Sequence, residues 1–444
     1  MKIALIAMSG IRVVDSELLE LGLTLPGFVD RSRIIASLPS LGLLTLAGMT
    51  SKEHNIKYIE VDQLPEENSL NDIMKDIDIV AISSFSAQIK ETYLLSDKIR
   101  KLKIPVILGG LHVSSLPEEA KEHCDTALIG EGELHWLDIL NDAKKGELKD
   151  FYGSVDEEYD LKDSPMPAFE LLDIEKYNRL TIQTSRGCPH SCEFCASSIL
   201  ITKKYKQKPI DKVLAEIDKI KTIWEHPMIE LAEDNTFINK EYWKELLPQL
   251  KERKIRWFTE TDISLAEDEE LLKSLSESGC AQVLIGFESP ELGSLDGIET
   301  KSNWKSKQFN KYKDAITKIQ SYGISVNGCF ILGLDEHDEG IFDSVFDFVK
   351  DTGLHEVQIT IQTAFPGTPL YERLEKEDRI IEKGAWEKCT LFDVNYLPKK
   401  MSAEELRNGF RNLGLKLYSD EFTKYRKENF KNILRGIIKA KRGI

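Results

Sequence analysis

Residues 186 to 195 read Arg186-Gly187-Cys188-Pro189-His190-Ser191-Cys192-Glu193-Phe194-Cys195. The three cysteines are spaced C-x₃-C-x₂-C, and Leu180–Ser185 before them predicts a short strand. Gly187 and Pro189 then break that strand into a loop. Three thiolates on one tight loop can converge on a single metal centre. They are one short of the four that complete a structural zinc or iron–sulfur site.

A zinc half-site completed by His190 would show the same cysteine spacing, and so would chance. A zinc site usually has two separated ligand pairs, and the sequence shows no second pair. His190 also stands too close between two cysteines to turn inward with them easily. A [4Fe-4S] cluster held by three cysteines keeps one iron free for another ligand, and this interpretation is favoured.

The loop resembles the signature of the radical S-adenosylmethionine (SAM) superfamily, in which SAM chelates the fourth iron through its amino and carboxylate groups. Phe194, directly before the last cysteine, also matches that family. The resemblance implies that Cys188, Cys192 and Cys195 hold a [4Fe-4S] cluster. It also implies that Phe194 packs near the adenine of SAM, although a core position is equally compatible with its apolar ring.

The composition limits the class of protein. The chain has 444 residues with a formal net charge of -16 and a pI near 5.2, so we expect two or three domains and no nucleic-acid partner. No apolar run is long enough to span a membrane, and the first residues do not form a signal peptide. We therefore expect a soluble cytoplasmic protein. Seven cysteines fit a reducing compartment, and those outside the loop are expected to be buried small hydrophobes: Cys124, Cys280, Cys329 and Cys389.

A first domain is predicted over residues 1–145, where strands and helices alternate. The clearest helix runs from Ser86 to Leu102. Five βα units imply a doubly wound parallel sheet of the Rossmann or flavodoxin type, which binds ligands beyond the carboxyl ends of its strands. The predicted strands are Lys2–Ala7, Ile56–Val61, Ile77–Ser83, Ile104–Gly109 and Thr126–Gly130.

Three loops at that edge carry glycine or serine, which let a ligand approach the backbone closely. No G-x-G-x-x-G follows the first strand, so the dinucleotide-binding interpretation fails. The loops resemble those of the cobalamin-binding domain that precedes many radical SAM domains, as does Leu38–Leu43. The resemblance implies cobalamin contacts at Ser83, Ser84, Gly109, Gly110, His112, Gly130, Glu131, Gly132 and Glu133. A D-x-H-x-x-G pattern at Asp335–Gly340 lies far outside this domain and is interpreted as coincidence, so no histidine is expected below the cobalt.

An acidic, proline-containing linker is predicted over residues 146–179, followed by a second domain over residues 180–385. Six strand–helix pairs predict a partial TIM-like (β/α)₆ barrel with catalytic groups at the strand ends. The predicted strands are Leu180–Ser185, Met228–Ala232, Ile255–Glu260, Ala281–Phe287, Ile324–Ile331 and Glu356–Ile361.

Acidic residues follow several of these strands and resemble the segments that line SAM and substrate in cobalamin-linked radical SAM proteins. Glu260 and Glu288 are the best candidates for SAM contacts. Glu233 and Asp234 are further candidates, for contact with SAM or substrate and not with a metal. Asp262 and Asp335 are expected to be helix caps instead.

A helical region is predicted over residues 386–444, with one helix starting at Ser402. Its end, Phe422–Ile444, is basic and has apolar residues at helical spacing. Such a helix can contact an anionic membrane, although packing against the protein is the simpler role. No basic β-barrel module of the kind found in tRNA-modifying relatives is visible.

The resemblance implies that the reduced cluster cleaves SAM to a 5′-deoxyadenosyl radical and that methylcobalamin methylates an unactivated carbon. The expected partners are a small-molecule or peptide substrate and an electron donor of the flavodoxin or ferredoxin type. Cyclisation, ring rearrangement or oxidation without methylation remains the main alternative. A cobalamin or redox sensor is a less favoured one. The sequence identifies no catalytic side chain.

Overall fold

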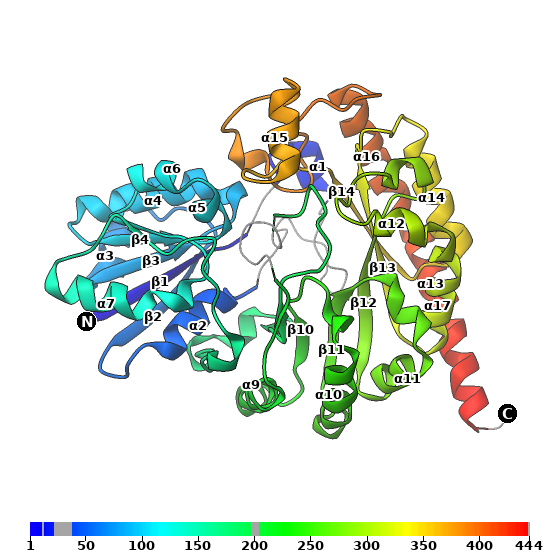
Figure 1. The fold of residues 1–444 in the computed structure, drawn as a ribbon, viewed down its shortest axis with the longest axis horizontal. Helices are drawn as coiled ribbons and strands as arrows, with labels where there is room; N and C mark the ends of the chain where they lie inside the picture. The colour runs from blue at the N-terminus through cyan, green and yellow to red at the C-terminus, as the bar shows by residue number, and fades with distance from the viewer. Residues whose placement is uncertain (11–12, 22–37, 197–203, 443–444) are drawn as a thin grey trace.

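Two six-stranded parallel sheets form the framework of the chain (Figure 1). The computed structural model describes residues 1–10, 13–21, 38–196 and 204–442. The first sheet lies on the left of Figure 1 and the second on the right. Helices of the C-terminal region lie above and beside the second sheet. The predicted α/β class, with a helical C-terminal region, is confirmed.

The first sheet has the strand order β2-β1-β3-β4-β5-β6, in which the order reverses between β1 and β3. Ligands of doubly wound sheets bind beyond the carboxyl ends at such a reversal. All five predicted strands are present to within two residues at each end. The sixth strand, β6, lies at the start of the predicted linker. It was not predicted because it is two residues long. The bounds are β1 Lys2–Met8, β2 Asn55–Val61, β3 Ile79–Ser83, β4 Val106–Gly109, β5 Thr126–Leu128 and β6 Phe151–Tyr152.

Helices cover both faces of the first sheet because its strands are apolar on both sides. In β1, for example, Ala4 and Ile6 face one layer of the core and Ile3 and Leu5 face the other. One face carries α3 (Glu67–Met74), α4 (Ile89–Lys101), α5 (Leu111–Ser115) and α6 (Pro117–Glu122). The other carries α2 (Leu41–Met49) and α7 (Trp136–Lys145), with the Trp136 side chain fully buried.

The second sheet has the order β14-β13-β12-β11-β10-β7 and forms the predicted partial barrel. All six predicted strands are present, with bounds β7 Leu180–Ile182, β10 Met228–Leu231, β11 Arg256–Thr261, β12 Cys280–Glu288, β13 Ser325–Leu332 and β14 Glu356–Ile361. The helices between or after them are α9 Ile210–Ile223, α10 Lys240–Arg253, α11 Glu269–Glu277, α12 Trp304–Gln308, α13 Tyr312–Ser321, α14 Ile341–Thr352 and α15 Pro369–Lys376. A short antiparallel ribbon, β8 (Ser185–Arg186) with β9 (Lys206–Gln207), stands at the base of the cysteine loop.

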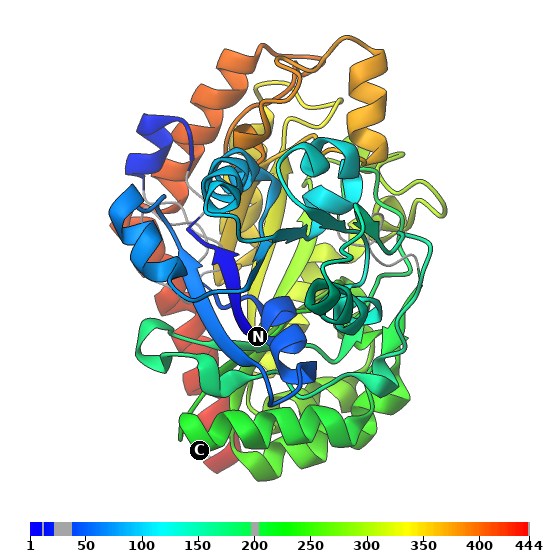
Figure 2. The ribbon, with the colours of Figure 1, turned by 90° about the vertical axis from the view of Figure 1, so that its left-hand side faces the viewer.

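The C-terminal helices α16 (Ala403–Leu417) and α17 (Asp420–Arg442) complete the fold. The predicted helix start at Ser402 is confirmed, with a capping box between Ser402 and Glu405. α16 packs beside β14 and α14, and it also meets α1 (Ser16–Glu20), a helix from the start of the chain. Figure 2 shows the same molecule from the side of the first domain.

The basic end of α17 has two kinds of side chain. Arg426 is buried and pairs with Glu356, and Phe430 is buried against the His355 ring. Lys424, Lys427, Lys431, Arg435 and Lys439 are exposed. The packing role foreseen for the helix is therefore present. No helix in the described residues is long and apolar enough to cross a membrane.

The barrel core predicts a stability effect. Phe330 of β13 is fully buried, and its ring lies 5.9 Å from Phe287 and 5.6 Å from Phe348. Phe330→Ala is expected to lower the free energy of unfolding by about 3–5 kcal/mol, because the removed ring leaves a cavity. Leu415→Ala on α16 is a control expected to stay within about 0.5 kcal/mol, since Leu415 is 47 % exposed. Chemical denaturation of the two variants measures the difference, and equal effects would contradict this description of the core.

Candidate active site between the two sheets

A cavity of about 630 Å³ lies where the carboxyl ends of the two sheets meet. One wall comes from the first domain and is mostly apolar or glycine. The other comes from the barrel and is polar. The residues that line it are Gly42, Leu43, Leu46, Ala81, Ile82, Ser83, Phe85, Ile107, Gly109, Gly110, Leu128, Gly130, Glu131, Gly132, Glu133 and Trp136 from the first domain, and Gln183, Arg186, Glu230, Ala232, Glu233, Asp234 and Glu260 from the barrel.

Most of the predicted cobalamin residues line this cavity. Gly110, the N-cap of α5, has φ +113°, and a Cβ there would lie 3.2 Å from the backbone oxygen of Ser84. Gly130 has φ +75°, and a Cβ there would lie 2.6 Å from the backbone oxygen of Ser154. Side chains are therefore excluded at both turns, which leaves the backbone open to the cavity. A Cβ at Gly42 would meet no atom within 4 Å, so α2 also presents bare backbone there.

Two of the predicted residues do not line the cavity. Ser84 is buried, and its hydroxyl donates to the backbone oxygen of Phe85. His112 is fully buried, with one ring nitrogen 3.1 Å from Ser86 Oγ and the other 3.2 Å from Glu119 Oε1. Glu119 also accepts from the indole of Trp386, which follows the barrel. His112 therefore joins the first domain to the C-terminal region.

The three cysteines of the loop lie after β8, with Cys192 buried and the others half-buried. Burial raises the pKa of Cys188 to about 11 and that of Cys192 to about 12, and the neighbouring thiols add to both shifts. Within the described residues the three thiols are not gathered into a ready metal site. They need a positively charged partner to become thiolates, as iron provides.

His190 faces away from the thiols. Its ring lies 4.7 Å from that of Trp304, and its Nε2 is 3.4 Å from Asp262 Oδ2. Although burial raises the pKa of Asp262, hydrogen bonds from His190, Ser264 and Asn235 outweigh it and bring the pKa to about 2. Asp262 also caps the turn that follows β11, as predicted. Because the His190 ring contacts Asp262 and Trp304, it is not placed to be the fourth ligand of a zinc site, and that interpretation is not supported.

Carboxylates at the end of β10 hold the entry to the cysteine loop. Glu233 is buried and accepts hydrogen bonds from the backbone N–H groups of Thr184 and Ser185 and from the Ser185 hydroxyl. Asp234 accepts from the backbone N–H of Gly187 at 2.8 Å. Burial raises the pKa of Glu233 to about 7 in spite of those donors. Both acids therefore position the loop, a role that the sequence analysis did not foresee.

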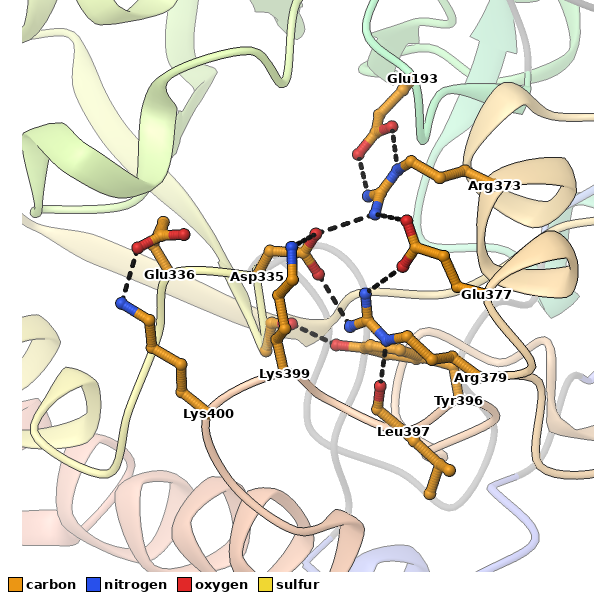
Figure 3. A network of polar contacts seen from close by, with 11 residues as sticks. Glu193, Asp335, Glu336, Arg373, Glu377, Arg379, Tyr396, Leu397, Lys399 and Lys400 are labelled. Atoms are coloured by element: carbon orange, nitrogen blue, oxygen red, sulfur yellow. Dashed lines mark hydrogen bonds and ion pairs between the residues drawn. The ribbon is translucent and has the colours of Figure 1, made fainter.

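A second set of contacts holds the middle of the loop (Figure 3). Glu193 accepts two hydrogen bonds from Arg373 of α15, at 2.6 and 3.0 Å. Arg373 also donates to Asp335, which accepts in turn from Arg379 at 2.8 Å. The prediction that Asp335 caps a helix was wrong. Its position after β13 matched a cap, but two arginines distant in sequence take both carboxylate oxygens.

Glu288, at the end of β12, has an unusual backbone. Its φ is +63°, and the pairing with β13 shifts register between Gly286 and Glu288. Its carboxylate accepts from Lys305 Nζ at 2.5 Å, and Lys305 also donates to the backbone oxygen of Gly286. The positive charge of Lys305 acts on both Cys188 and Cys192. The sequence analysis missed Lys305, because nothing in its local pattern sets it apart from other lysines.

Glu260, at the end of β11, differs from the other acids. Glu230 pairs with Arg179, and Glu233 and Asp234 hold backbone N–H groups. Within the described residues, no side chain or backbone group donates to the Glu260 carboxylate. The side chain opens into the cavity. Enclosure by the protein, together with Glu230, Asp234 and Glu233, raises its pKa to about 8. Such a group is suited to meet a cationic or hydroxyl group of a ligand.

Five more of the predicted residues do not line the cavity: Cys188, Cys192, Cys195, Glu288 and Phe194. Phe194 packs against the barrel core, which is the second of the two positions foreseen for it. His337, in the D-x-H-x-x-G pattern, is fully buried in the barrel, with Nε2 3.0 Å from Ser289 Oγ and Nδ1 accepting from the backbone N–H of Leu334. Burial lowers its pKa to about 4. The pattern is therefore part of the barrel core and not of the cobalamin domain.

Comparison with family models identifies three segments of the chain. Residues 182–349 match the radical SAM superfamily, and residues 33–138 match the B12 binding domain. The chain contains a radical SAM domain and a B12-binding domain. Residues 368–440 match a domain of unknown function, which contains α16 and most of α17. The cofactors are therefore a [4Fe-4S] cluster, SAM and cobalamin, as the resemblance of the sequence implied.

Similar proteins support the same assignment. The chain is 26% identical to the bacteriochlorophyllide d C-12(1)-methyltransferase of Chlorobaculum tepidum, over 85% of this chain and 82% of that protein. It is 29% identical to the C-8(2)-methyltransferase of the same organism, over 79% of this chain and 78% of that protein. It is 24% identical to the hopanoid C-2 methylase of Rhodopseudomonas palustris, over 78% and 66%.

The fold matches that of a solved structure, the radical SAM methyltransferase TsrM from Kitasatospora setae with cobalamin and a [4Fe-4S] cluster bound. The TM-score is 0.70 at 13% identity, over 94% of this chain and 89% of that one.

The residues of this chain fit both metal cofactors. The three thiols, none of them in a disulfide, supply the donor set that iron–sulfur clusters use. The glycine turns at Gly110 and Gly130 and the bare helix end at Gly42 leave room for close contact with a large ligand. Cobalamin would be held by these turns, and the cluster by Cys188, Cys192 and Cys195.

Removal of one thiol tests the cluster loop. Cys192→Ala is expected to abolish formation of 5′-deoxyadenosine, since two cysteines cannot hold the cluster in a state that binds SAM. Cys280→Ala is the control, because Cys280 is buried in β12 and is expected to leave iron and sulfide content unchanged. Iron, sulfide and deoxyadenosine are measured after anaerobic reconstitution. Normal SAM cleavage by Cys192→Ala would overturn the assignment.

The raised pKa of Glu260 predicts a pH effect on stability. Between its ordinary value of 4.5 and about 8 the folded protein keeps a proton that the unfolded chain releases. Stability without SAM therefore falls as pH rises through that window, but only slightly, because Glu260 is exposed to the open cavity and solvent screens its charge. Glu260→Gln should remove part of the fall. The variant should melt at a higher temperature than the parent at pH 8 and bind SAM more weakly. Thermal unfolding at pH 5 and pH 8, with the exposed Glu252→Gln as control, measures this. A variant less stable than the parent at pH 8 would contradict it.

Proposed function

We propose that the protein methylates an unactivated carbon of a small molecule, using the cavity between its two domains as the reaction chamber. One observation carries the proposal: the predicted cobalamin turns and the polar barrel ends line the same cavity, and the strand that leads into the cysteine loop contributes Gln183 and Arg186 to it. When bound, SAM on the reduced cluster supplies a 5′-deoxyadenosyl radical and methylcobalamin supplies the methyl group.

In this proposal the residues that line or flank the cavity have different roles. Glu260 accepts from a cationic or hydroxyl group of SAM, since it has no partner in the described residues. Glu288, held by Lys305, is the second candidate for a SAM contact. Glu233 and Asp234 keep the cysteine loop in place, and the apolar first-domain wall excludes water. The functional units are proposed to be residues 1–145 and 180–385, with residues 146–179 as linker and 386–444 as helical region.

The relatives indicate a substrate class. Their names describe methyl transfer to bacteriochlorophyllide d and to hopanoids, both of which carry large apolar ring systems. We propose a substrate of that kind for this chain. The reductant is proposed to be a flavodoxin or ferredoxin. Contact of α17 with an anionic membrane stays a proposal supported by its exposed lysines.

The alternative without methylation also has a relative, the anaerobic magnesium-protoporphyrin IX monomethyl ester cyclase of Cereibacter sphaeroides, at 23% identity over 86% of this chain. It is less favoured, because the methyltransferases named above match at higher identity. Both reactions use the same cavity, so the product must distinguish them.

The deciding experiment uses methyl-deuterated SAM. The protein is reconstituted anaerobically with iron, sulfide and hydroxocobalamin, reduced, and incubated with bacteriochlorophyllide d or a hopanoid. Mass spectrometry is expected to find a deuterated methyl group in the product, together with 5′-deoxyadenosine. An altered product without deuterium would establish the cyclase-type alternative. Deoxyadenosine without any altered product from either substrate would reject the proposed substrate class.

A further inference from the structure

A buried cluster of charges joins the first domain to both strands of the ribbon at the base of the cysteine loop. The ribbon consists of β8 and β9, and the chain between them carries all three cysteines. Each strand contributes one cation, Arg186 from β8 and Lys206 from β9. Both cations reach the loop Gly130–Glu133 of the first domain, which contributes two carboxylates.

The contacts within this cluster are short and interlocked. Arg186 donates to Glu131 through one guanidinium nitrogen and to Glu133 through another, the latter at 2.8 Å. Lys206 donates to the second oxygen of Glu131 at 2.5 Å and to the backbone oxygen of Tyr159 at 3.0 Å. The backbone N–H of Tyr159 donates to the same Glu131 oxygen at 2.7 Å. Glu131 therefore touches both strands of the ribbon and the linker.

The four side chains are almost withdrawn from solvent. Glu131 is 1 % exposed, Glu133 9 %, Lys206 13 % and Arg186 18 %. Two positive and two negative charges balance. Because a buried ion pair gains little over a well-packed apolar pair, net stability alone is a weak explanation for such a set. Its geometric effect is specific, since loss of one member leaves an unpaired buried charge.

The loop that these cations hold has other contacts as well, since the Gly130 N–H donates to Ser114 Oγ at 2.9 Å and a single 3-10 turn covers Gly132–Leu134. Glycine stands on both sides of Glu131, and Gly130 has a positive φ, so the backbone there has unusual freedom. Glu131, Gly132 and Glu133 nevertheless line the cavity, as does Arg186. The ion pairs therefore connect this part of the cavity wall to the ribbon that carries the cysteine loop.

We propose that Arg186 and Lys206, paired with Glu131 and Glu133, are positioning residues that make binding of the corrinoid and assembly of the cluster loop mutually dependent. A consequence for catalysis follows, namely that radical formation depends on methyl delivery. This consequence rests on the proposed function. Binding of the corrinoid or of the iron–sulfur cluster fixes the Gly130–Glu133 loop and the ribbon together. The affinity for the other cofactor therefore rises by the same factor.

Binding measurements on the full-length protein test the dependence. Hydroxocobalamin affinity is measured by titration for protein with and without reconstituted iron and sulfide. We expect the cluster to raise cobalamin affinity by about fivefold or more in the parent protein. Glu133→Gln, Lys206→Gln and the charge-balanced pair Arg186→Gln with Glu133→Gln are each expected to bring that factor close to one. Glu133→Gln keeps the shape of the side chain and the Arg186–Glu131 pair, so the test survives if an Arg186 variant does not fold.

A matched control separates this effect from general loss of a buried charge. Arg426 of α17 is also buried and paired with a carboxylate, Glu356, but lies outside the cavity. Arg426→Gln is expected to lower stability and to leave the affinity factor unchanged. A parent protein whose cobalamin affinity does not depend on the cluster would overturn the inference. So would an unchanged factor in Glu133→Gln and Lys206→Gln proteins that hold a full complement of iron.

A second measurement concerns turnover. The ratio of 5′-deoxyadenosine to methylated product is expected to rise several-fold in Glu133→Gln and to stay at the parent value in Arg426→Gln. A ratio equal to that of the parent would refute the catalytic consequence. If the parent yields no methylated product but its cobalamin affinity depends on the cluster as expected, the proposed function fails and the structural coupling stands.

Discussion

The geometry of the site depends on carboxylates that accept hydrogen bonds from the backbone of the cysteine loop. Glu233 and Asp234 bind the chain at Thr184, Ser185 and Gly187, immediately before the first cysteine. Glu193 holds the loop again between the second and third cysteines. A loop has few backbone hydrogen bonds of its own, so contacts from outside it are supplied by Glu233 and Asp234 after β10 and by Arg373 of α15. These contacts hold the chain just before the first cysteine and again between the second and the third.

The sequence predicted the fold well because both sheets are built from short apolar strands in regular alternation with helices. The eleven predicted strands are all present, and the cysteine spacing was specific enough to identify the cluster loop. β6 was not predicted, because a strand of two residues has no periodic pattern. The glycine turns could be predicted because positions with positive φ or uncovered backbone favour glycine, which is visible in the sequence.

Partners distant in sequence could not be predicted. Arg373 lies 180 positions from Glu193, and the ion pair between Arg186 and Glu131 spans 55 positions. Asp335 was misassigned for this reason, because its neighbours in sequence resemble a helix start while its partners come from α15 and beyond. His112 is a similar case: the motif predicted a cobalamin contact, but only the packed structure shows that the residue is buried in α5, with Ser86 and Glu119 at its two ring nitrogens.

The contact between α1 and α16 has a consequence for biosynthesis. Asp15 pairs with Arg407, and the backbone N–H groups of Val14 and Asp15 donate to Asp393. The ribosome makes the chain from its N-terminus, so the first sheet can form while the later residues are still untranslated. The segment after β1 must then wait until residues 393 and 407 have been made before its partners exist. Packing of this segment onto the C-terminal region is therefore an event that comes at the end of translation or after it.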